Sequence, residues 1–266
     1  KVTAPLGSIF NPKAPASAEA RFTQCNRMID LIIRALAPVM PEKVIAGSSA
    51  SISFAAYSGV RPSGDYWVFL EVNEGAYGGR PRSDGPDCID NLMANTRNNP
   101  LEDLAMHIPM ICDRYELRDD MPPGAGEFRG GIGVVKSQRV LTQAFITHES
   151  ERHTDAPWGI FGGHDGTVGR CTITNPNRHG DVRDMPSKFS GLAVEADDVM
   201  TYYSPNGGGY GNPLNRPPVK VLEDVLDGFC TVAHAREVYG VVVDLDAETV
   251  DMAATEKRRA VMQKTS

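Results

Sequence analysis

The chain has 266 residues, enough for one large domain or two modest ones with a buried core. Its 41% hydrophobic and 23% charged residues are ordinary for a globular protein. The net charge of −7 argues against a nucleic-acid or anionic-membrane surface, because both reward basic patches. The sequence also has no run of about 18 apolar residues that could span a bilayer.

The first predicted element is a helix over residues 18–37, which Ser17 can cap and Pro38 ends. Apolar side chains recur in it at steps of three and four, a pattern that predicts one face packed on a core: Phe22, Cys25, Ile29, Ile32 and Leu36. Residues 1–43 are therefore expected to form an N-terminal arm and helix. Because the chain opens on Lys1 within a loop-like stretch, we expect it to be the C-terminal portion of a longer protein.

From about residue 44 to residue 200 the helical period fades and a β-rich core is predicted. Short apolar runs are separated by clusters of Gly, Pro, Asp and Asn, which is typical of strands joined by turns. The runs are YWVFLEV (66–72), GVVKSQRVL (133–141), QAFITHE (143–149) and VGRCTIT (168–174).

Residues 201–266 are predicted to form a glycine-rich loop and an α/β tail. Short helices are expected over 219–229, stopped by Gly228, and over 231–240, ended by Gly240. A strand and a turn follow, and Asp251 can cap a last helix. The whole chain therefore predicts an α+β fold with a β-rich central region.

Five cysteines are scattered without any Cys-x-x-Cys pair: Cys25, Cys88, Cys112, Cys171 and Cys230. An odd number without a pattern indicates reduced thiols and a cytoplasmic protein.

Few residues have the spacing that catalysis or metal binding needs. His148 and His153 are five apart, whereas two ligands on one helix face are four apart. A cluster of these two with Asp155 and His164 is conceivable, but polar loop residues are favoured, so no metal site is predicted. Asp84, Asp87 and Asp90 lie three apart; their spacing fits an acid/base pair or, preferably, turn and cap residues.

No nucleotide or hydrolase motif is present. The sequence has no Gly-x-Gly-x-x-Gly, no Walker lysine after a glycine cluster and no Gly-x-Ser-x-Gly elbow. Catalytic residues therefore stay unassigned, and any nucleotide is expected to bind outside this chain.

Four glycine clusters are the most unusual feature: residues 74–85, 124–133, 157–166 and 204–218. Each has an aromatic or an arginine beside its glycines. They could be hairpin and bulge glycines of a β domain. Alternatively, their backbone N–H groups could line a ligand site or a subunit junction.

With these clusters the chain resembles the C-terminal half of the hydantoinase B/oxoprolinase family. The matching segments follow the family's order: GSIFNPKAPA (7–16), GAYGGRPRSDGPD (75–87), NNPLEDLAMHIP (98–109), GAGEFRGGIG (124–133), PWGIFGGHDG (157–166), SPNGGGYGNPLNRPP (204–218) and VLEDVLDG…AREVYGVVVD (221–244). Where members have an Asp-Ser-Gly-Gly stretch, this chain has DDMPPGAG (119–126), which puts its subgroup in doubt.

The resemblance implies a division of labour between subunits. An A-type subunit would bind ATP and phosphorylate an amide or enolate oxygen. The B-type subunit would bind substrate and a divalent metal, with the metal ligands in an N-terminal half that is absent here. The expected partners are thus an A-type subunit, that N-terminal half and a small-molecule substrate.

The favoured activity is ATP-dependent hydrolysis of a cyclic amide such as a hydantoin, 5-oxoproline or another lactam. The alternatives are ATP-dependent carboxylation of a ketone, as in acetone and acetophenone carboxylases, and a non-catalytic assembly module. Substrate binding is predicted for two glycine clusters, with Arg80 as a fork for an anion and Tyr210 as a bulky contact: Gly78, Gly79, Arg80, Asp84, Asn206, Gly207, Gly208, Gly209 and Tyr210.

Overall fold

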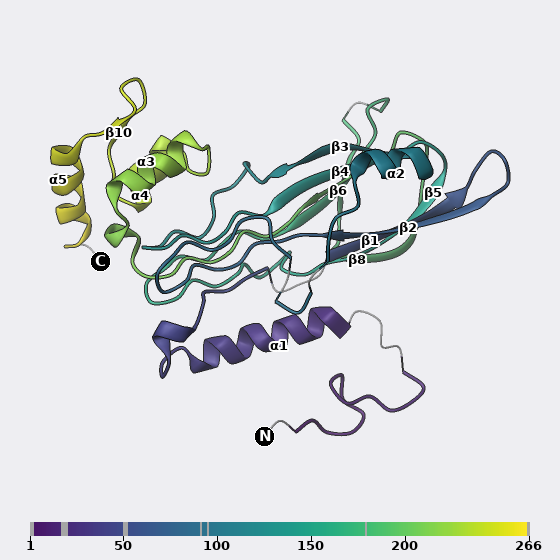
Figure 1. Ribbon diagram of the computed structural model, residues 1–266, viewed down its shortest axis with the longest axis horizontal. Coiled ribbons are helices and arrows are strands. Elements are labelled where there is room, and N and C mark those ends of the chain that lie inside the picture. Colours follow the sequence, from purple (N-terminus) through teal and green to yellow (C-terminus); the bar gives the residue numbers. More distant parts are fainter. Residues whose placement is uncertain are drawn as a thin grey trace.

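A computed structural model describes residues 3–16, 21–49, 53–90, 92–94, 96–178 and 180–264. Figure 1 shows a β-sandwich, a set of extended strands without regular sheet that leave one of its ends, and a small helical unit beyond them. The N-terminal helix α1 (Arg21–Leu36) runs along one side. The predicted Ser17 cap lies outside the described residues. The fold is α+β, as the sequence predicts.

The sandwich consists of two antiparallel sheets. One has the strand order β2-β1-β5-β8 and the other β3-β4-β9-β6-β7. Their bounds are β1 Ser53–Val60, β2 Tyr66–Asn73, β3 Met110–Leu117, β4 Val134–Val140, β5 Ala144–Glu149, β6 Arg170–Thr174, β7 Val182–Met185, β8 Lys188–Val194 and β9 Val199–Tyr203. The four strands expected from apolar runs are confirmed as β2, β4, β5 and β6.

The sandwich core follows from alternation along the strands, since neighbouring side chains point to opposite faces. In β2, Trp67 is buried between the sheets whereas Tyr66 and Val68 face outward. The buried cluster draws on both sheets: Ala55, Tyr57, Trp67, Met110, Val140, Ala144, Ile146, Cys171, Ile173, Val194, Met200 and Tyr202. The short helix α2 (Leu101–His107) precedes β3 and buries Leu104.

Helix α1 exists as predicted, but its predicted apolar stripe is not its most buried side: Cys25 and Ile29 are half-buried and the other three members are exposed. The side that faces the body is polar, with Thr23, Asn26 and Asp30 at most 6% exposed. Phe22 and Ile32, from the predicted apolar stripe, are 39% and 46% exposed. The prediction that this stripe packs on the chain's own core is wrong, because hydrogen bonds rather than apolar contacts anchor the helix.

The C-terminal unit is built as the sequence predicts. Helix α3 (Pro218–Leu226), helix α4 (Val232–Val238), the hairpin β10 (Val243–Asp244) and β11 (Thr249–Val250), and helix α5 (Met252–Met262) follow one another. Asp251 caps α5 by accepting from Ala254 N at 2.9 Å. A second apolar cluster holds the unit together: Ala125, Val221, Val225, Cys230, Ala235, Tyr239 and Val241. No helix in the described ranges is long and apolar enough to cross a bilayer.

Candidate functional site

The four glycine clusters gather into one bundle of extended backbone segments, and residues 207–209 run through its middle. Their three N–H groups donate to Gly131 O, Gly47 O and His164 O, each at 2.9 Å. Their carbonyls accept from Gly124 N, Gly79 N and Ile160 N at 2.8–3.0 Å. Three consecutive residues thus point in three directions, as in a polyproline-II-like chain with three residues per turn. A β-strand would direct them to only two sides.

Close packing explains why these positions are glycine. A Cβ at Gly207, Gly208 or Gly209 would lie 2.0–2.1 Å from a backbone carbonyl oxygen of Tyr77, Trp158 or Ala125. No side chain fits that space, so the segment carries none. Gly207, Gly208 and Gly209 are therefore neither hairpin nor bulge residues; they let backbone pack on backbone.

Several residues predicted to bind substrate lie inside this bundle. A Cβ at Gly78 would meet Ala46 O at 2.1 Å, and one at Gly79 would meet Phe128 O at 2.4 Å. Asn206 is fully buried; its Oδ1 accepts from Gly133 N and its Nδ2 donates to Met121 O, both at 2.8 Å. These contacts account for the residues as packing elements. Substrate binding by them stays a prediction.

Arg80 and Asp84 are close in sequence but have different surroundings. Arg80 is exposed, and its Nε donates to the backbone oxygen of Asp84 at 3.0 Å. The carboxylate of Asp84 instead faces Arg216, which donates to both of its oxygens at 2.6 and 2.9 Å. The guanidinium of Arg80 is thus open to an anion, whereas the carboxylate of Asp84 is already paired.

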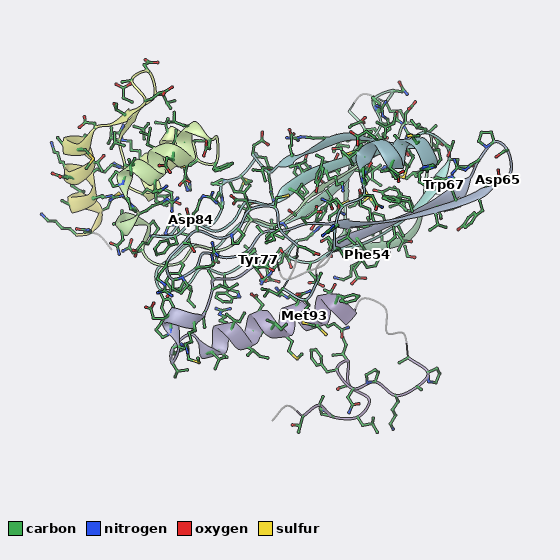
Figure 2. The ribbon with its side chains drawn as sticks, in the orientation of Figure 1. Phe54, Asp65, Trp67, Tyr77, Asp84 and Met93 are labelled. Carbon is green, nitrogen blue, oxygen red and sulfur yellow. The ribbon has the colours of Figure 1, made fainter. Side chains whose placement is uncertain are left out.

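Asp84 belongs to a buried ion network that joins the bundle to the C-terminal helices (Figure 2). Arg216 also pairs with Asp224, and Arg129 pairs with Asp224 and Asp87 at 3.1 and 2.8 Å. Burial alone would raise the pKa of Asp84, but the hydrogen bonds and charge of Arg216 lower it overall. The prediction that Asp84 and Asp87 are turn or cap residues is therefore incomplete, since each carboxylate also pairs with an arginine.

Tyr210 lies at an edge of the bundle, next to Phe161. Its ring meets the Phe161 ring edge-on with centroids 5.3 Å apart, and its hydroxyl donates to Pro41 O at 3.0 Å. Pro41 belongs to the short 3-10 helix η1 (Pro41–Lys43) after α1. Tyr210 has side-chain surface that a ligand or another chain could touch.

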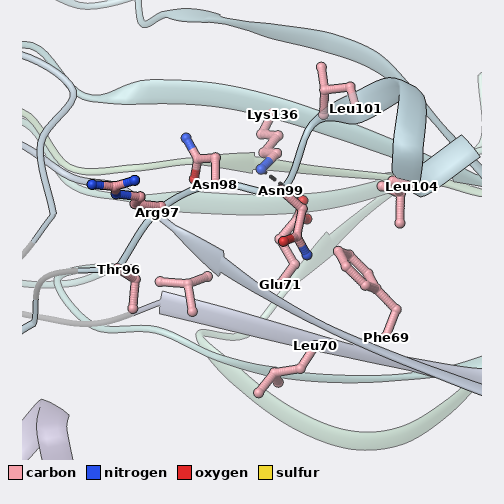
Figure 3. Close-up of a pocket in the computed structure, with 11 residues that line it drawn as sticks. Phe69, Leu70, Glu71, Thr96, Arg97, Asn98, Asn99, Leu101, Leu104 and Lys136 are labelled. Carbon is pink, nitrogen blue, oxygen red and sulfur yellow. Dashed lines mark ion pairs between the residues drawn. The ribbon is translucent and has the colours of Figure 1, made fainter.

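A small polar cavity of about 120 Å³ lies between β2, β4 and the loop before α2 (Figure 3). Glu71 and Lys136 meet in it, with Oε1 and Nζ 2.7 Å apart and both side chains at most 6% exposed. Gln138 Nε2 donates to the same Glu71 oxygen at 2.7 Å. Burial raises the pKa of Glu71, although Lys136 and Gln138 oppose this. The cavity could hold a few waters or a very small anion beside Lys136.

A larger cleft of about 620 Å³ lies between α1 and residues 152–168. Arg152 has a φ of +63°, uncommon for a residue with a side chain, and its buried guanidinium pairs with Asp30. Trp158 Nε1 donates to Asp30 at 3.0 Å, and the Arg34 guanidinium lies 5.3 Å from the Trp158 ring centroid. Arg27 and Arg34 line the same cleft, and the charge of Arg27 also acts on Asp30. Because Asp155 and Asp165 line the cleft as well, its charged groups are of both signs.

The histidines considered as metal ligands do not converge on one site. His148 Nε2 and His153 Nε2 lie 3.2 and 2.8 Å from Ser150 Oγ, so they share a hydroxyl. Burial lowers the pKa of His148 to about 3 and that of His153 to about 4. Within the described part of the chain, no group of three or more His, Cys, Asp or Glu is placed to hold a metal ion. The side chains described in the structure therefore offer a divalent metal no set of three ligands.

Most of the charged groups that organise the site could not be recognised from sequence patterns. Asp224 had a usable signal, because it lies on the buried face of α3 with Val221 and Val225. An acid on an apolar helix face indicates a buried partner. Arg129 and Arg152 had no comparable signal, since their partners lie far away along the chain. Arg216 lies eight residues before Asp224, but its other partner, Asp84, is 132 residues away.

Known proteins resemble this chain in sequence and in architecture. Residues 1–213 match the profile of the hydantoinase B/oxoprolinase family. A protein of Pseudomonas sp. (strain NS671) named as the B component of a D-/L-hydantoinase is 42% identical over 262 residues, which cover 98% of this chain and 43% of that protein. The beta chain of the caprolactamase of Pseudomonas jessenii is 29% identical over 96% of this chain and 45% of its own length.

Solved structures share the fold. The ATP-dependent caprolactamase from Pseudomonas jessenii superposes with a TM-score of 0.78 and 26% identity, over 97% of this chain and 46% of that chain. A nucleotide-free acetone carboxylase shares the fold with a TM-score of 0.70 and 20% identity, over 86% of this chain and 35% of its own. The chain thus spans less than half the length of these relatives, and it belongs to the hydantoinase B/oxoprolinase family.

Proposed function

We propose that this chain is part of an ATP-dependent enzyme that hydrolyses a cyclic amide. The observation that carries the proposal is its 42% identity, over 98% of its length, to a protein named as the B component of a hydantoinase. The likeness to a caprolactamase component supports a ring amide as the substrate class.

In this proposal an A-type partner binds ATP and transfers its γ-phosphoryl group to the amide oxygen. A resonance-stabilised amide is a poor electrophile, and phosphorylation gives its carbon a good leaving group. Two waters are consumed: one opens the C–N bond, and one releases the phosphoryl group as phosphate. The B-type subunit would hold the substrate during these steps, and a divalent metal would be bound outside residues 1–266.

Within this chain, Arg80 is the exposed member of the predicted substrate-binding set, and Asp84 and Tyr210 are its half-buried members. The carboxylate of Asp84 is already paired with Arg216. An arginine fork binds a carboxylate or phosphoryl group through two parallel hydrogen bonds. The buried members, Gly78, Gly79, Asn206 and Gly207–Gly209, would act through the backbone that they bring together. A cytoplasmic location is part of the proposal, supported by five cysteines that are all free thiols.

Ketone carboxylation is the alternative activity, because an acetone carboxylase shares the fold. The test is to reconstitute the full-length B-type subunit with its A-type partner and measure ADP release. Release that depends on hydantoin, 5-oxoproline or caprolactam supports hydrolysis. ADP release that requires a ketone and bicarbonate would instead support carboxylation. If neither substrate class causes ADP release, an assembly role is favoured.

A further inference from the structure

Helix α1 presents its apolar side to the outside, although a surface helix normally buries it. Leu31, Ile32 and Leu36 are 60%, 46% and 42% exposed. The opposite side is fixed by specific bonds: Thr23 donates to Glu149 Oε1 at 3.1 Å, and Asn26 Oδ1 accepts from Met93 N at 3.2 Å. Because this anchored side is polar and fully partnered, the apolar side cannot simply turn inward.

The four-stranded sheet also has an apolar outer face. Along β2, Tyr66, Val68 and Leu70 are 69%, 57% and 58% exposed. On β5, Phe145 is 51% exposed and lies in the same row as Val68, since both strands pair with Ser58 between them. Antiparallel sheets with one solvated face usually carry polar residues there.

These two surfaces form one side of the molecule. Phe145 and Glu149 lie on the same face of β5, because they are four positions apart in a strand, and Glu149 accepts from Thr23 in the first turns of α1. Figure 1 shows α1 running along the extended segments that leave the sandwich, with its N-terminal end toward β1 and β8. The N-terminal arm has the same character: Leu6, Ile9 and Phe10 are 57–67% exposed. Several large apolar side chains exposed on one helix, one sheet face and one arm are typical of an interface.

We propose that this apolar side is where the chain binds the remaining part of the full-length B-type subunit. Relatives that match this chain over nearly its whole length are more than twice as long, since it covers only 43–46% of them. A segment of the same polypeptide is held near this surface at high effective concentration, however many subunits the complex contains. A second copy or the A-type partner would have to meet the same surface from a separate chain. The inference rests on family membership and not on the proposed activity.

The test uses the full-length subunit in its native complex. The photo-reactive amino acid p-benzoylphenylalanine replaces Ile32 on α1 or Val68 on β2, and it replaces Lys257 on the exposed side of α5 as a matched control. After irradiation, the cross-linked peptides are identified by mass spectrometry. We expect positions 32 and 68 to link at least about tenfold more than position 257, to peptides of the same subunit outside residues 1–266.

Links from positions 32 and 68 to the A-type subunit, to a second copy, or at no higher yield than from position 257 would overturn the proposal. None of these readouts depends on catalysis, so the proposed function can fail while this inference stands.

Discussion

At the residue scale, the glycines of the bundle are explained by the space around them. Gly208 has three neighbouring segments within reach: its N–H donates to Gly47, its carbonyl accepts from Gly79, and Trp158 O occupies the place of its side chain. Positions of this kind tolerate no substitution, whatever further role the bundle has.

We therefore expect Gly208→Ala to lower the free energy of unfolding by about 3 kcal/mol or more, because a methyl group 2.1 Å from Trp158 O must displace backbone. Gly191→Ala is the matched control. Gly191 has a φ of +62° and nothing within 4 Å of an added Cβ, so it should lose only about 1–2 kcal/mol. Urea denaturation measures both. Equal losses in the two variants would contradict the packing explanation.

Arg80 tests the substrate-binding prediction. Arg80→Lys should lower turnover of the reconstituted enzyme at least about tenfold, equivalent to roughly 1.4 kcal/mol of transition-state stabilisation, because lysine cannot form a bidentate fork. The melting temperature should not change, since Arg80 is exposed. Arg82→Lys, at an exposed arginine two positions along the same loop, is the control and should leave turnover unchanged. Identical kinetics in the two variants would leave Arg80 without a role in binding.

At the element scale, local patterns predicted some of the helices and strands but neither the remaining ones, such as β1, β3, β9 and α2, nor how the elements are oriented. The strands β2, β4, β5 and β6 and the helices α3, α4 and α5 follow from apolar spacing, Gly228 and the Asp251 cap. The orientation of α1 could not be predicted, because it depends on bonds from Asn26 and Asp30 to residues far along the chain. The bundle was also beyond prediction, since glycines specify close approach but not which segments approach.

Two histidines, His148 on β5 and His153 just after it, should make the stability of the fold depend on pH. Burial lowers the pKa of His148 and His153 to about 3 and 4, whereas the unfolded chain binds protons near the ordinary histidine pKa of about 6.5. Between pH 6.5 and about 4 the unfolded state therefore holds more protons, and stability falls as the pH falls. We expect the melting temperature to decrease from pH 7 to pH 5.

The variant His153→Gln should flatten that decrease, because it removes a group that is neutral only in the folded state. His107→Gln is the control, since His107 lies exposed at the end of α2. Melting curves between pH 5 and pH 7 provide the comparison. A slope that His153→Gln leaves untouched would show that other groups cause the acid sensitivity.

At the scale of the whole molecule, the ion network is the joint between the bundle and the C-terminal unit. Arg129 comes from the bundle, Arg216 and Asp224 from the C-terminal side, and Asp84 and Asp87 from the loop between β2 and α2. Three carboxylates face two guanidinium groups, so each arginine neutralises more than one acid. Replacing either arginine would leave a buried carboxylate without its partner.

We expect Arg216→Lys to loosen this joint without unfolding the sandwich. Lysine cannot reach Asp84 and Asp224 together, as Arg216 does through Nε and both Nη atoms. Hydrogen exchange should become at least about tenfold faster in α3, α4 and α5 and stay unchanged in β4, β5 and β9. Uniform acceleration across the chain would mean that the network stabilises the whole fold and not one joint.

The last prediction concerns what residues 1–266 can do alone. The glycine segments, which elsewhere bind phosphates through free N–H groups, here donate to one another, as Gly207, Gly208 and Gly209 do. The sequence has no nucleotide motif, and the described residues have no three-ligand metal group. The purified chain should therefore show no substrate-dependent ATP hydrolysis above background in a coupled ADP assay. Adding the A-type subunit to this chain should not restore activity, whereas adding it to the full-length B-type subunit should. ATP turnover by residues 1–266 alone would place the phosphoryl-transfer site inside this chain and overturn the division of labour between the subunits.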